Sequence, residues 1–181
     1  PQIELKTGRV TGFESLARWN HPTLGLLPAG EFIPFAEQSN LVEAIDTLMF
    51  QKACRALREL DQRGLGDVSV SVNLSTGRMK DPMLADRLLR VVTEEGVSIQ
   101  NVRIEILENT LLTDGSTELS KNIFRLAEMG FPLELDDFGS GHAAIASLRA
   151  YPISRIKVAR GLVTNVAKDR QLQAITDSIL D

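Results

Sequence analysis

From residue 68 onward, the chain alternates short apolar segments of strand length with longer segments of helical periodicity. Such alternation predicts parallel strands joined by helical crossovers, because a tight turn cannot connect a parallel pair. The predicted strands are Val68–Leu74, Val102–Leu107, Pro132–Leu135 and Ile153–Val158. The predicted helices are Met83–Glu95, Thr117–Met129, Ala143–Arg149 and Gln171–Leu180. The fold class is therefore α/β with a mostly parallel sheet.

The N-terminal part follows a different pattern. Residues 3–16 form two short alternating runs joined at Lys6-Thr7-Gly8, and so short a link predicts an antiparallel hairpin. Residues 26–40 predict a proline-punctuated loop with a short helix, and Leu41–Arg63 has the apolar spacing of a long helix that ends at Gly64. Six strands can be placed, whereas a closed eight-stranded barrel takes about 250 residues. An open sheet and a barrel without its last units both remain compatible with this pattern.

Composition narrows the class of protein. The net charge is -4 and 43% of the residues are hydrophobic, as in soluble globular domains. A nucleic-acid polymer is not expected as a partner, because no stripe of Lys and Arg stands out. No run approaches the roughly 18 apolar residues of a membrane span. The single Cys54 falls in a helical pattern, which indicates a core residue and fits a cytoplasmic location; a membrane anchor outside these residues is left open.

Polar side chains fall at or near the C-terminal ends of the predicted strands, where parallel α/β proteins bind ligands. They are Glu14, Asn73, Glu105, the pair Asp136–Asp137, and Lys157. Any one of them has an ordinary structural explanation, such as a helix N-cap for an aspartate. However, carboxylates about 4 Å apart repel by about 4 kcal/mol at an effective dielectric constant near 20, so several at one rim require cations. Carboxylate and amide oxygens suit Mg²⁺ or Mn²⁺, and the chain has no zinc-like grouping of Cys and His.

Two basic residues extend this hypothesis. Lys157 lies between Ile156 and Val158 in a predicted strand, where a lysine is costly unless it faces the carboxylates. With metals present it could orient a water or stabilise charge on a phosphoryl oxygen. Arg18 follows Glu14 by four residues, and its guanidinium could bind a phosphate or form a plain surface ion pair. Gly139 and Gly141 permit a sharp turn after the paired aspartates.

In this order and spacing, the residues resemble the EAL-domain family of cyclic di-GMP phosphodiesterases. The resemblance rests on TGRVTGFESLARWNHPTLGLLPAGEFIPFAEQSNLV, VSVNLS, RIEILE, LELDDFGSG and YPISRIKVARGLV, which extend along the whole chain. It implies a TIM-like (β/α) barrel whose first strand is antiparallel to the rest. The family's last two strands are not in this chain, so residues 1–181 are expected to form a partial EAL-type phosphodiesterase domain with its C-terminal βα units absent.

The resemblance also implies the chemistry: hydrolysis of cyclic di-GMP to pGpG with two Mg²⁺ or Mn²⁺ ions. The implied metal ligands are Glu14, Asn73, Glu105, Asp136 and Asp137. Lys157, which holds the attacking water, and Asp137, which contacts the second metal, are the implied catalytic residues. Arg18 and Leu16 are implied to contact the substrate, and Glu108 is implied to steady the loop after the paired aspartates.

Three departures from the family pattern leave an alternative open. The signature reads Glu14-Ser15-Leu16 rather than Glu-Ala-Leu, Ser140 replaces a threonine, and Ala159 replaces an acid. The alternative is a catalytically degenerate EAL domain that acts as a cyclic di-GMP receptor or a protein-interaction module. The 181 residues alone are expected to be inactive or nearly so. Open sheet edges predict a homodimer, and the resemblance implies fusion to a sensory or diguanylate-cyclase-like domain in the parent protein.

Overall fold

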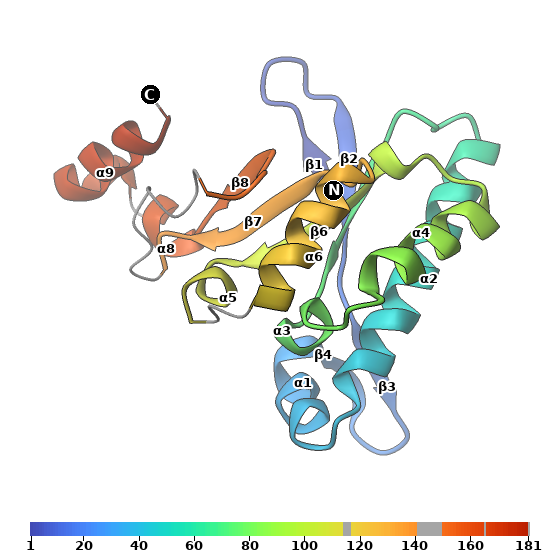
Figure 1. Cartoon of the computed structure of the whole chain (residues 1–181). Helices are drawn as coiled ribbons and strands as arrows, with labels where there is room; N and C mark the ends of the chain where they lie inside the picture. Colours follow the sequence, from blue (N-terminus) through green and yellow to red (C-terminus); the bar gives the residue numbers. More distant parts are fainter. Residues whose placement is uncertain (114–116, 141–149, 165, 181) are drawn as a thin grey trace.

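The computed structural model describes residues 1–113, 117–140, 150–164 and 166–180. Its main feature is a six-stranded sheet that curls into part of a barrel (Figure 1). In spatial order the strands are β1 (Gln2–Ile3), β2 (Val10–Ser15), β5 (Ser69–Asn73), β6 (Val102–Leu107), β7 (Leu133–Phe138) and β8 (Arg155–Val158). β1 is antiparallel to β2, and every other neighbouring pair is parallel. The predicted TIM-like barrel with an antiparallel first strand is confirmed.

Three long helices cover one face of this sheet, as Figure 1 shows. They are α2 (Val42–Gln62), α4 (Leu84–Glu95) and α6 (Thr117–Glu128). Between them and the strands lies the main apolar core, to which the strands contribute Val70, Val72, Val102, Ile104, Ile106 and Leu133. Full burial of one such side chain contributes about 1.5–3 kcal/mol, so this layer is the main source of stability. The apolar residue at every second strand position therefore faces the helices.

Helix boundaries match the expected ones within a residue or two. The helix expected at Met83–Glu95 is α4, and it ends at Gly96, which has a left-handed φ of 67°. The helix expected at Gln171–Leu180 is α9 (Arg170–Leu180). The helix expected at Ala143–Arg149, together with His142 and Gly141, lies outside the described residues.

One β-hairpin was missed by the sequence patterns. Residues 18–28 form an antiparallel hairpin of β3 (Arg18–His21) and β4 (Gly25–Pro28), where only a loop starting at residue 26 was expected. The expected short helix follows it as α1 (Ala29–Gln38). Trp19 packs against Phe32 with ring centroids 5.9 Å apart, so the hairpin is held by a contact that strand periodicity does not show.

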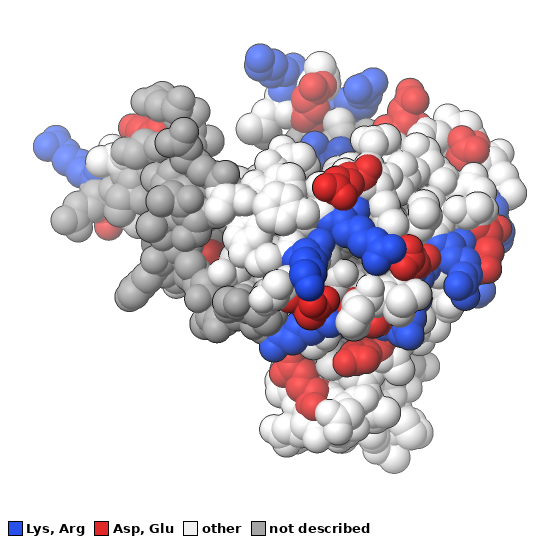
Figure 2. Space-filling model, in the orientation of Figure 1, with Lys and Arg blue, Asp and Glu red and all other residues white. Residues whose placement is uncertain are grey.

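Short helical segments complete the connections. They are α3 (Thr76–Met79), η1 (Ile99–Asn101), α5 (Glu108–Thr113), α8 (Arg160–Val163) and η2 (Val166–Lys168). No helix among the described residues combines the length and the apolar character needed to cross a membrane. Figure 2 shows Lys and Arg side chains interspersed with Asp and Glu on the face that it presents. Exposed ion pairs among the described residues, such as Arg125–Asp86, contribute roughly 0–1 kcal/mol each.

The buried thiol of Cys54 gives a test of the core. Its side chain is 0% exposed in α2, and burial, with a smaller contribution from the charge of Glu95, raises the pKa of the thiol to about 12. We expect a thiol reagent such as Ellman's reagent to leave Cys54 unmodified at pH 8 in the folded protein and to react fully after unfolding in guanidinium chloride. Rapid stoichiometric reaction of the folded protein would contradict this packing.

Candidate active site

Strand register brings three acidic side chains to one place on the inner face of the sheet. Asn73 of β5 pairs with Glu105 of β6, and Asp136 of β7 pairs with the residue two positions after Glu105. The carboxylates of Glu14, Glu105 and Asp136 offer oxygens that all lie within 4.8 Å of one another. We call these three residues the acid cluster. Three separate strands thus each contribute one carboxylate to the same point.

Glu105 lies at the centre of this arrangement and is 1% exposed. Asn73 Nδ2 donates a hydrogen bond of 2.8 Å to Glu105 Oε2, and Lys157 Nζ forms an ion pair with Oε1. Burial raises the pKa of Glu105 to about 7; the hydrogen bond and charge of Lys157 oppose this, and the nearby charges of Glu14 and Asp136 add to it. Full ionisation of the acid cluster is therefore costly.

Lys157 is the positive charge among these acids. Its Nζ also lies 3.4 Å from Glu14 Oε2. Desolvation lowers the pKa of Lys157, but the hydrogen bond and charge of Glu105, with the charges of Glu14 and Asp136, outweigh it and raise the pKa overall. The ammonium group stays protonated and holds Glu14 and Glu105 together.

A β-bulge separates the two adjacent aspartates. Leu135 pairs with Ile156 and Phe138 pairs with Val158, so β7 has one residue more than β8 over this stretch. Asp137 takes the left-handed conformation with φ of 59°, and its N–H donates to Asp136 Oδ1 at 2.9 Å. Asp136 is a member of the acid cluster, whereas Asp137 is exposed and is not one of its three carboxylates.

The chain after these aspartates is held by Glu108. The buried Oε2 of Glu108 accepts a 2.6 Å hydrogen bond from the N–H of Gly139. Gly139 has φ of 87°, and a Cβ at this position would collide with the side chain of Leu162. The backbone conformation therefore favours glycine there. Glu108 lies where a loop-steadying residue is expected.

The two expected substrate contacts, Leu16 and Arg18, are both exposed. Leu16 is 51% exposed. Arg18 is also exposed, and its Nη1 donates to the carbonyl of Ala17 at 2.8 Å. Arg18 borders an apolar groove with Trp19 and Phe32 rather than a carboxylate. Their roles in substrate binding remain predictions.

A second polar layer lies deeper on the inner face and was not anticipated from the sequence. Glu134 is 0% exposed; its Oε2 accepts from Ser71 Oγ at 2.7 Å, and its Oε1 pairs with Arg103 at 2.9 Å and Arg155 at 3.3 Å. The signal was present in the strands, where polar residues alternate with the apolar ones that face the helices. Two arginines against one glutamate give this layer positive charge beneath the acids.

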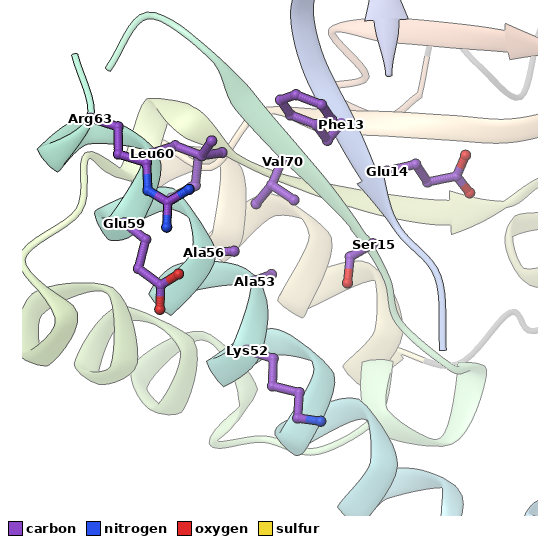
Figure 3. A pocket seen from close by; sticks show the side chains of 11 residues that line it. Phe13, Glu14, Ser15, Lys52, Ala53, Ala56, Glu59, Leu60, Arg63 and Val70 are labelled. Atoms are coloured by element: carbon purple, nitrogen blue, oxygen red, sulfur yellow. The ribbon is translucent and has the colours of Figure 1, made fainter. Parts of the chain in front are cut away.

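A neighbouring hollow of ≈ 470 Å³ is distinct from the acid cluster. It lies between β2 and α2 and is lined mainly by apolar residues, among them Phe13, Val70, Ala56 and Leu60. Figure 3 shows the side chain of Glu14 pointing away from the α2 side chains that line this hollow. Glu14 therefore borders the hollow near its backbone, and its carboxylate lies on the inner face of the sheet.

Comparison with known proteins agrees with this geometry. Residues 1–181 match the family model described as the EAL domain. The chain belongs to the EAL domain family. An uncharacterized protein of Mycobacterium tuberculosis is 34% identical over 181 residues, which are 99% of this chain and 29% of that protein. The bifunctional diguanylate cyclase/cyclic di-GMP phosphodiesterase MucR of Pseudomonas aeruginosa is 30% identical over 180 residues, or 99% of this chain and 26% of MucR.

Comparison with solved structures also relates this chain to EAL domains. The solved MucR phosphodiesterase in complex with c-di-GMP superposes with a TM-score of 0.90 and 29% identity, over 98% of this chain and 71% of that one. EAL-domain neighbours of this kind are TIM-like barrels, as the curled sheet indicates. The chain spans less than a third of the length of the curated relatives named above.

Glu105 gives a test of the acid cluster. Its folded pKa of about 7 lies above its ordinary value of 4.5, so the metal-free folded state binds more protons than the unfolded state between these values. The free energy of unfolding should therefore fall as pH rises from 4.5 to 7. Because a cation favours the carboxylate, Mn²⁺ should raise the melting temperature more at pH 7.5 than at pH 5.

Glu105→Gln should flatten this pH dependence and largely remove the stabilisation by Mn²⁺. The matched control is Glu118→Gln, an exposed glutamate paired with Lys121 on α6. Thermal unfolding with and without Mn²⁺ measures both effects. Equal Mn²⁺ stabilisation of the two variants would show that the ion does not bind at the acid cluster.

Proposed function

We propose that a protein carrying this chain within a complete barrel hydrolyses cyclic di-GMP to pGpG, with Mg²⁺ or Mn²⁺ as cofactor. The observation that carries the proposal is the meeting of Glu14, Glu105 and Asp136 with Asn73 and Lys157 on one face of the curled sheet. Membership of the EAL family and the phosphodiesterase relatives support it. The chain covers 71% of the solved MucR domain, so the activity is proposed for the longer protein.

The residues present fit a divalent-cation site. The acid cluster and Asn73 offer carboxylate and amide oxygens, the donors that Mg²⁺ and Mn²⁺ prefer. Without a cation, burial raises the pKa of Glu105, the hydrogen bond and charge of Lys157 oppose this, and the charges of Glu14 and Asp136 add to it. Glu14, Asn73, Glu105 and Asp136 would hold the ions, with Asp137 assigned to the second. Two bound cations supply Lewis-acid stabilisation of charge on the attacking and leaving oxygens.

The chain's own groups have separate tasks in this proposal. The Lys157 ammonium donates a hydrogen bond to the attacking water and orients it toward phosphorus. The exposed guanidinium of Arg18 can exchange the Ala17 carbonyl for a phosphate oxygen of the substrate, with Leu16 alongside. Glu108, through the N–H of Gly139, fixes the chain that carries Asp136 and Asp137. Water orientation, phosphate contact and loop position thus fall to different residues.

Replacing Lys157 tests the proposed activity. With Mg²⁺ or Mn²⁺, the longer protein should release pGpG, measured by liquid chromatography. Lys157→Met should lower kcat by about 100-fold or more, because it removes a positioned donor and a charge. Lys121→Met, on the exposed face of α6, should retain activity. No turnover by the folded wild-type protein with either metal would refute the proposed hydrolysis.

Ala159 favours an alternative function without catalysis. It is buried at the end of β8 and supplies no carboxylate at a position where the family usually has one. The alternative is a cyclic di-GMP receptor without turnover. Calorimetry followed by chromatography separates the two, since a receptor binds the nucleotide and leaves it intact. Absence of binding by the folded protein with metal would contradict both and favour a protein-interaction module.

The relatives also indicate which other domains accompany this one. MucR combines phosphodiesterase with diguanylate cyclase function in one chain, so we infer a regulatory or cyclase-like domain in the parent of this chain. A cyclic dinucleotide substrate places the proposed reaction in the cytoplasm.

A homodimer is the assembly that we propose for the 181 residues. In the six-stranded sheet, β1 and β8 each pair with one neighbour only, which leaves two edges able to pair with another chain. We expect light scattering to report a mass near twice the 19.9 kDa of the chain. A monodisperse monomer over the whole accessible concentration range would contradict this.

A further inference from the structure

A pocket on the outer wall of the barrel gathers three arginines. It has a volume of ≈ 360 Å³ and lies between α2, α3 and α4, on the helix-covered side of the sheet. Its lining includes the arginines Arg78, Arg87 and Arg90, together with Thr47 and Gln51 and a base of Phe50, Leu88 and Val91. The acid cluster is on the opposite, inner face, so this pocket belongs to a different site.

Arg78 of α3 is the unusual member of this group because it is only 4% exposed. Its Nη1 donates to Asp81 Oδ2 at 3.1 Å. Its Nε is buried and has no hydrogen-bond partner among the described residues. A buried donor on a charged group without an acceptor is costly, so Asp81 alone does not satisfy the guanidinium group of Arg78.

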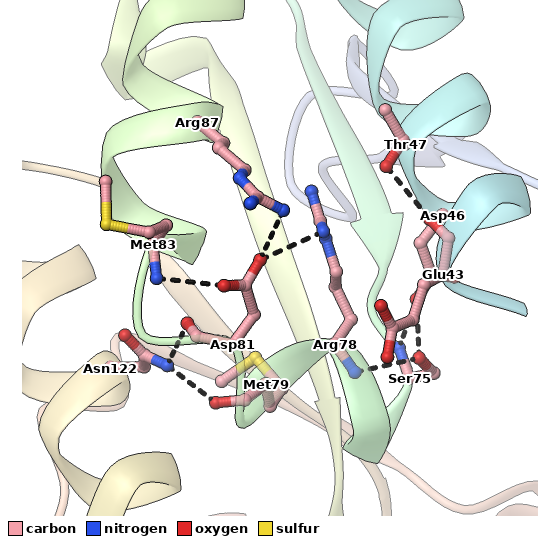
Figure 4. A network of polar contacts seen from close by, with 10 residues as sticks. All are labelled: Glu43, Asp46, Thr47, Ser75, Arg78, Met79, Asp81, Met83, Arg87 and Asn122. Carbon is pink, nitrogen blue, oxygen red and sulfur yellow. Dashed lines mark hydrogen bonds and ion pairs between the residues drawn. The ribbon is translucent and has the colours of Figure 1, made fainter.

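Arg87 is held beside Arg78 by the same carboxylate. Arg87 Nη1 lies 2.8 Å from Asp81 Oδ2, while Asp81 Oδ1 accepts from the N–H of Met83 at 2.9 Å. Asn122 Nδ2 fixes this turn through 2.8 Å hydrogen bonds to the carbonyls of Met79 and Asp81. Figure 4 shows the two guanidinium groups converging on Asp81. One shared carboxylate positions both cations and cannot neutralise both.

Arg90 follows Arg87 by three residues and so lies on the same side of α4. It is exposed and has no ion pair within the described ranges 1–113, 117–140, 150–164 and 166–180. Glu94 also lines the pocket. Asp46, which accepts from Ser75 N at 3.0 Å and Ser75 Oγ at 2.6 Å, also places a carboxylate near Arg78. Three guanidinium groups thus border the pocket, with the carboxylates of Asp46, Asp81 and Glu94 beside them.

We propose that this pocket binds an oxyanion of the phosphate class, either inorganic phosphate or the phosphate group of a nucleotide. Guanidinium groups match phosphate oxygens through paired N–H donors. Arginine donors from α3 and from two positions on α4 can each meet a different oxygen of a tetrahedral anion. A planar carboxylate has too few oxygens for all three.

Calorimetry on metal-free protein in a phosphate-free buffer tests this proposal. The probes are inorganic phosphate, GMP and acetate, titrated separately. We expect saturable binding of one phosphate per chain and weak or absent binding of acetate. Tighter binding of GMP than of inorganic phosphate identifies a nucleotide source, and the reverse identifies the free anion. Either order supports the phosphate class.

Arg90→Gln should weaken phosphate binding by about tenfold, the loss of one charge-assisted contact. Because Arg90 is exposed and unpaired in the described part of the chain, the variant should melt at the wild-type temperature without phosphate. Arg55→Gln is the matched control: Arg55 is an exposed arginine on α2 that shares Glu95 with Arg58, outside the pocket. No saturable binding of either phosphate probe, acetate binding as tight as phosphate, or equal affinity of the two variants would overturn the proposal. Phosphate bound at the acid cluster would give this last result.

Discussion

The balance of charge on the inner face of the sheet is the constraint on which the rest of the structure depends. Barrel interiors are usually filled by branched apolar side chains, but here the inner face is polar in two layers. The acid cluster with Lys157 lies above Glu134 and its two arginines. Buried charges of this kind are tolerated only when they are paired or bind ions. The apolar alternate positions, packed on α2, α4 and α6, must supply the stability that this polar layer does not.

A single inserted residue decides how the paired aspartates are used. In a regular strand, Asp136 and Asp137 would face opposite sides of the sheet. The bulge opposite β8 and the left-handed conformation of Asp137 turn the second carboxylate out to the exposed rim instead. The hydrogen bond from Gly139 to Glu108 then fixes the chain just after the bulge. Two neighbouring acids therefore acquire different surroundings, one within the acid cluster and one at its solvent side.

Sequence periodicity predicted the local features of the fold well, and it predicted which residues would lie at the strand ends. The antiparallel first strand follows from the short link at Lys6-Thr7-Gly8, which is visible in the chain. The polar layer around Glu134 was missed because its partners Ser71 and Arg103 are 63 and 31 residues away in sequence. The orientations of Asp137 and Arg18 were not predictable either, since a bulge and a hairpin set them. These features arise from tertiary pairing, for which local patterns carry little signal.

The acid cluster and the arginine pocket lie on opposite faces of the sheet, yet one short segment joins them. Asn73, which binds Glu105, is followed by Ser75, the N-cap of α3, and α3 carries Arg78. Asp46 of α2 holds Ser75 by two hydrogen bonds, so the segment is fixed from the helical side as well. A ligand that shifts α3 would also shift Asn73 through residues 74 and 75. A cation that fixes the position of Asn73 would in turn restrict α3. Thermodynamic linkage makes any such change in binding free energy equal in both directions. The two sites are therefore coupled to the extent that residues 73–78 move as a unit.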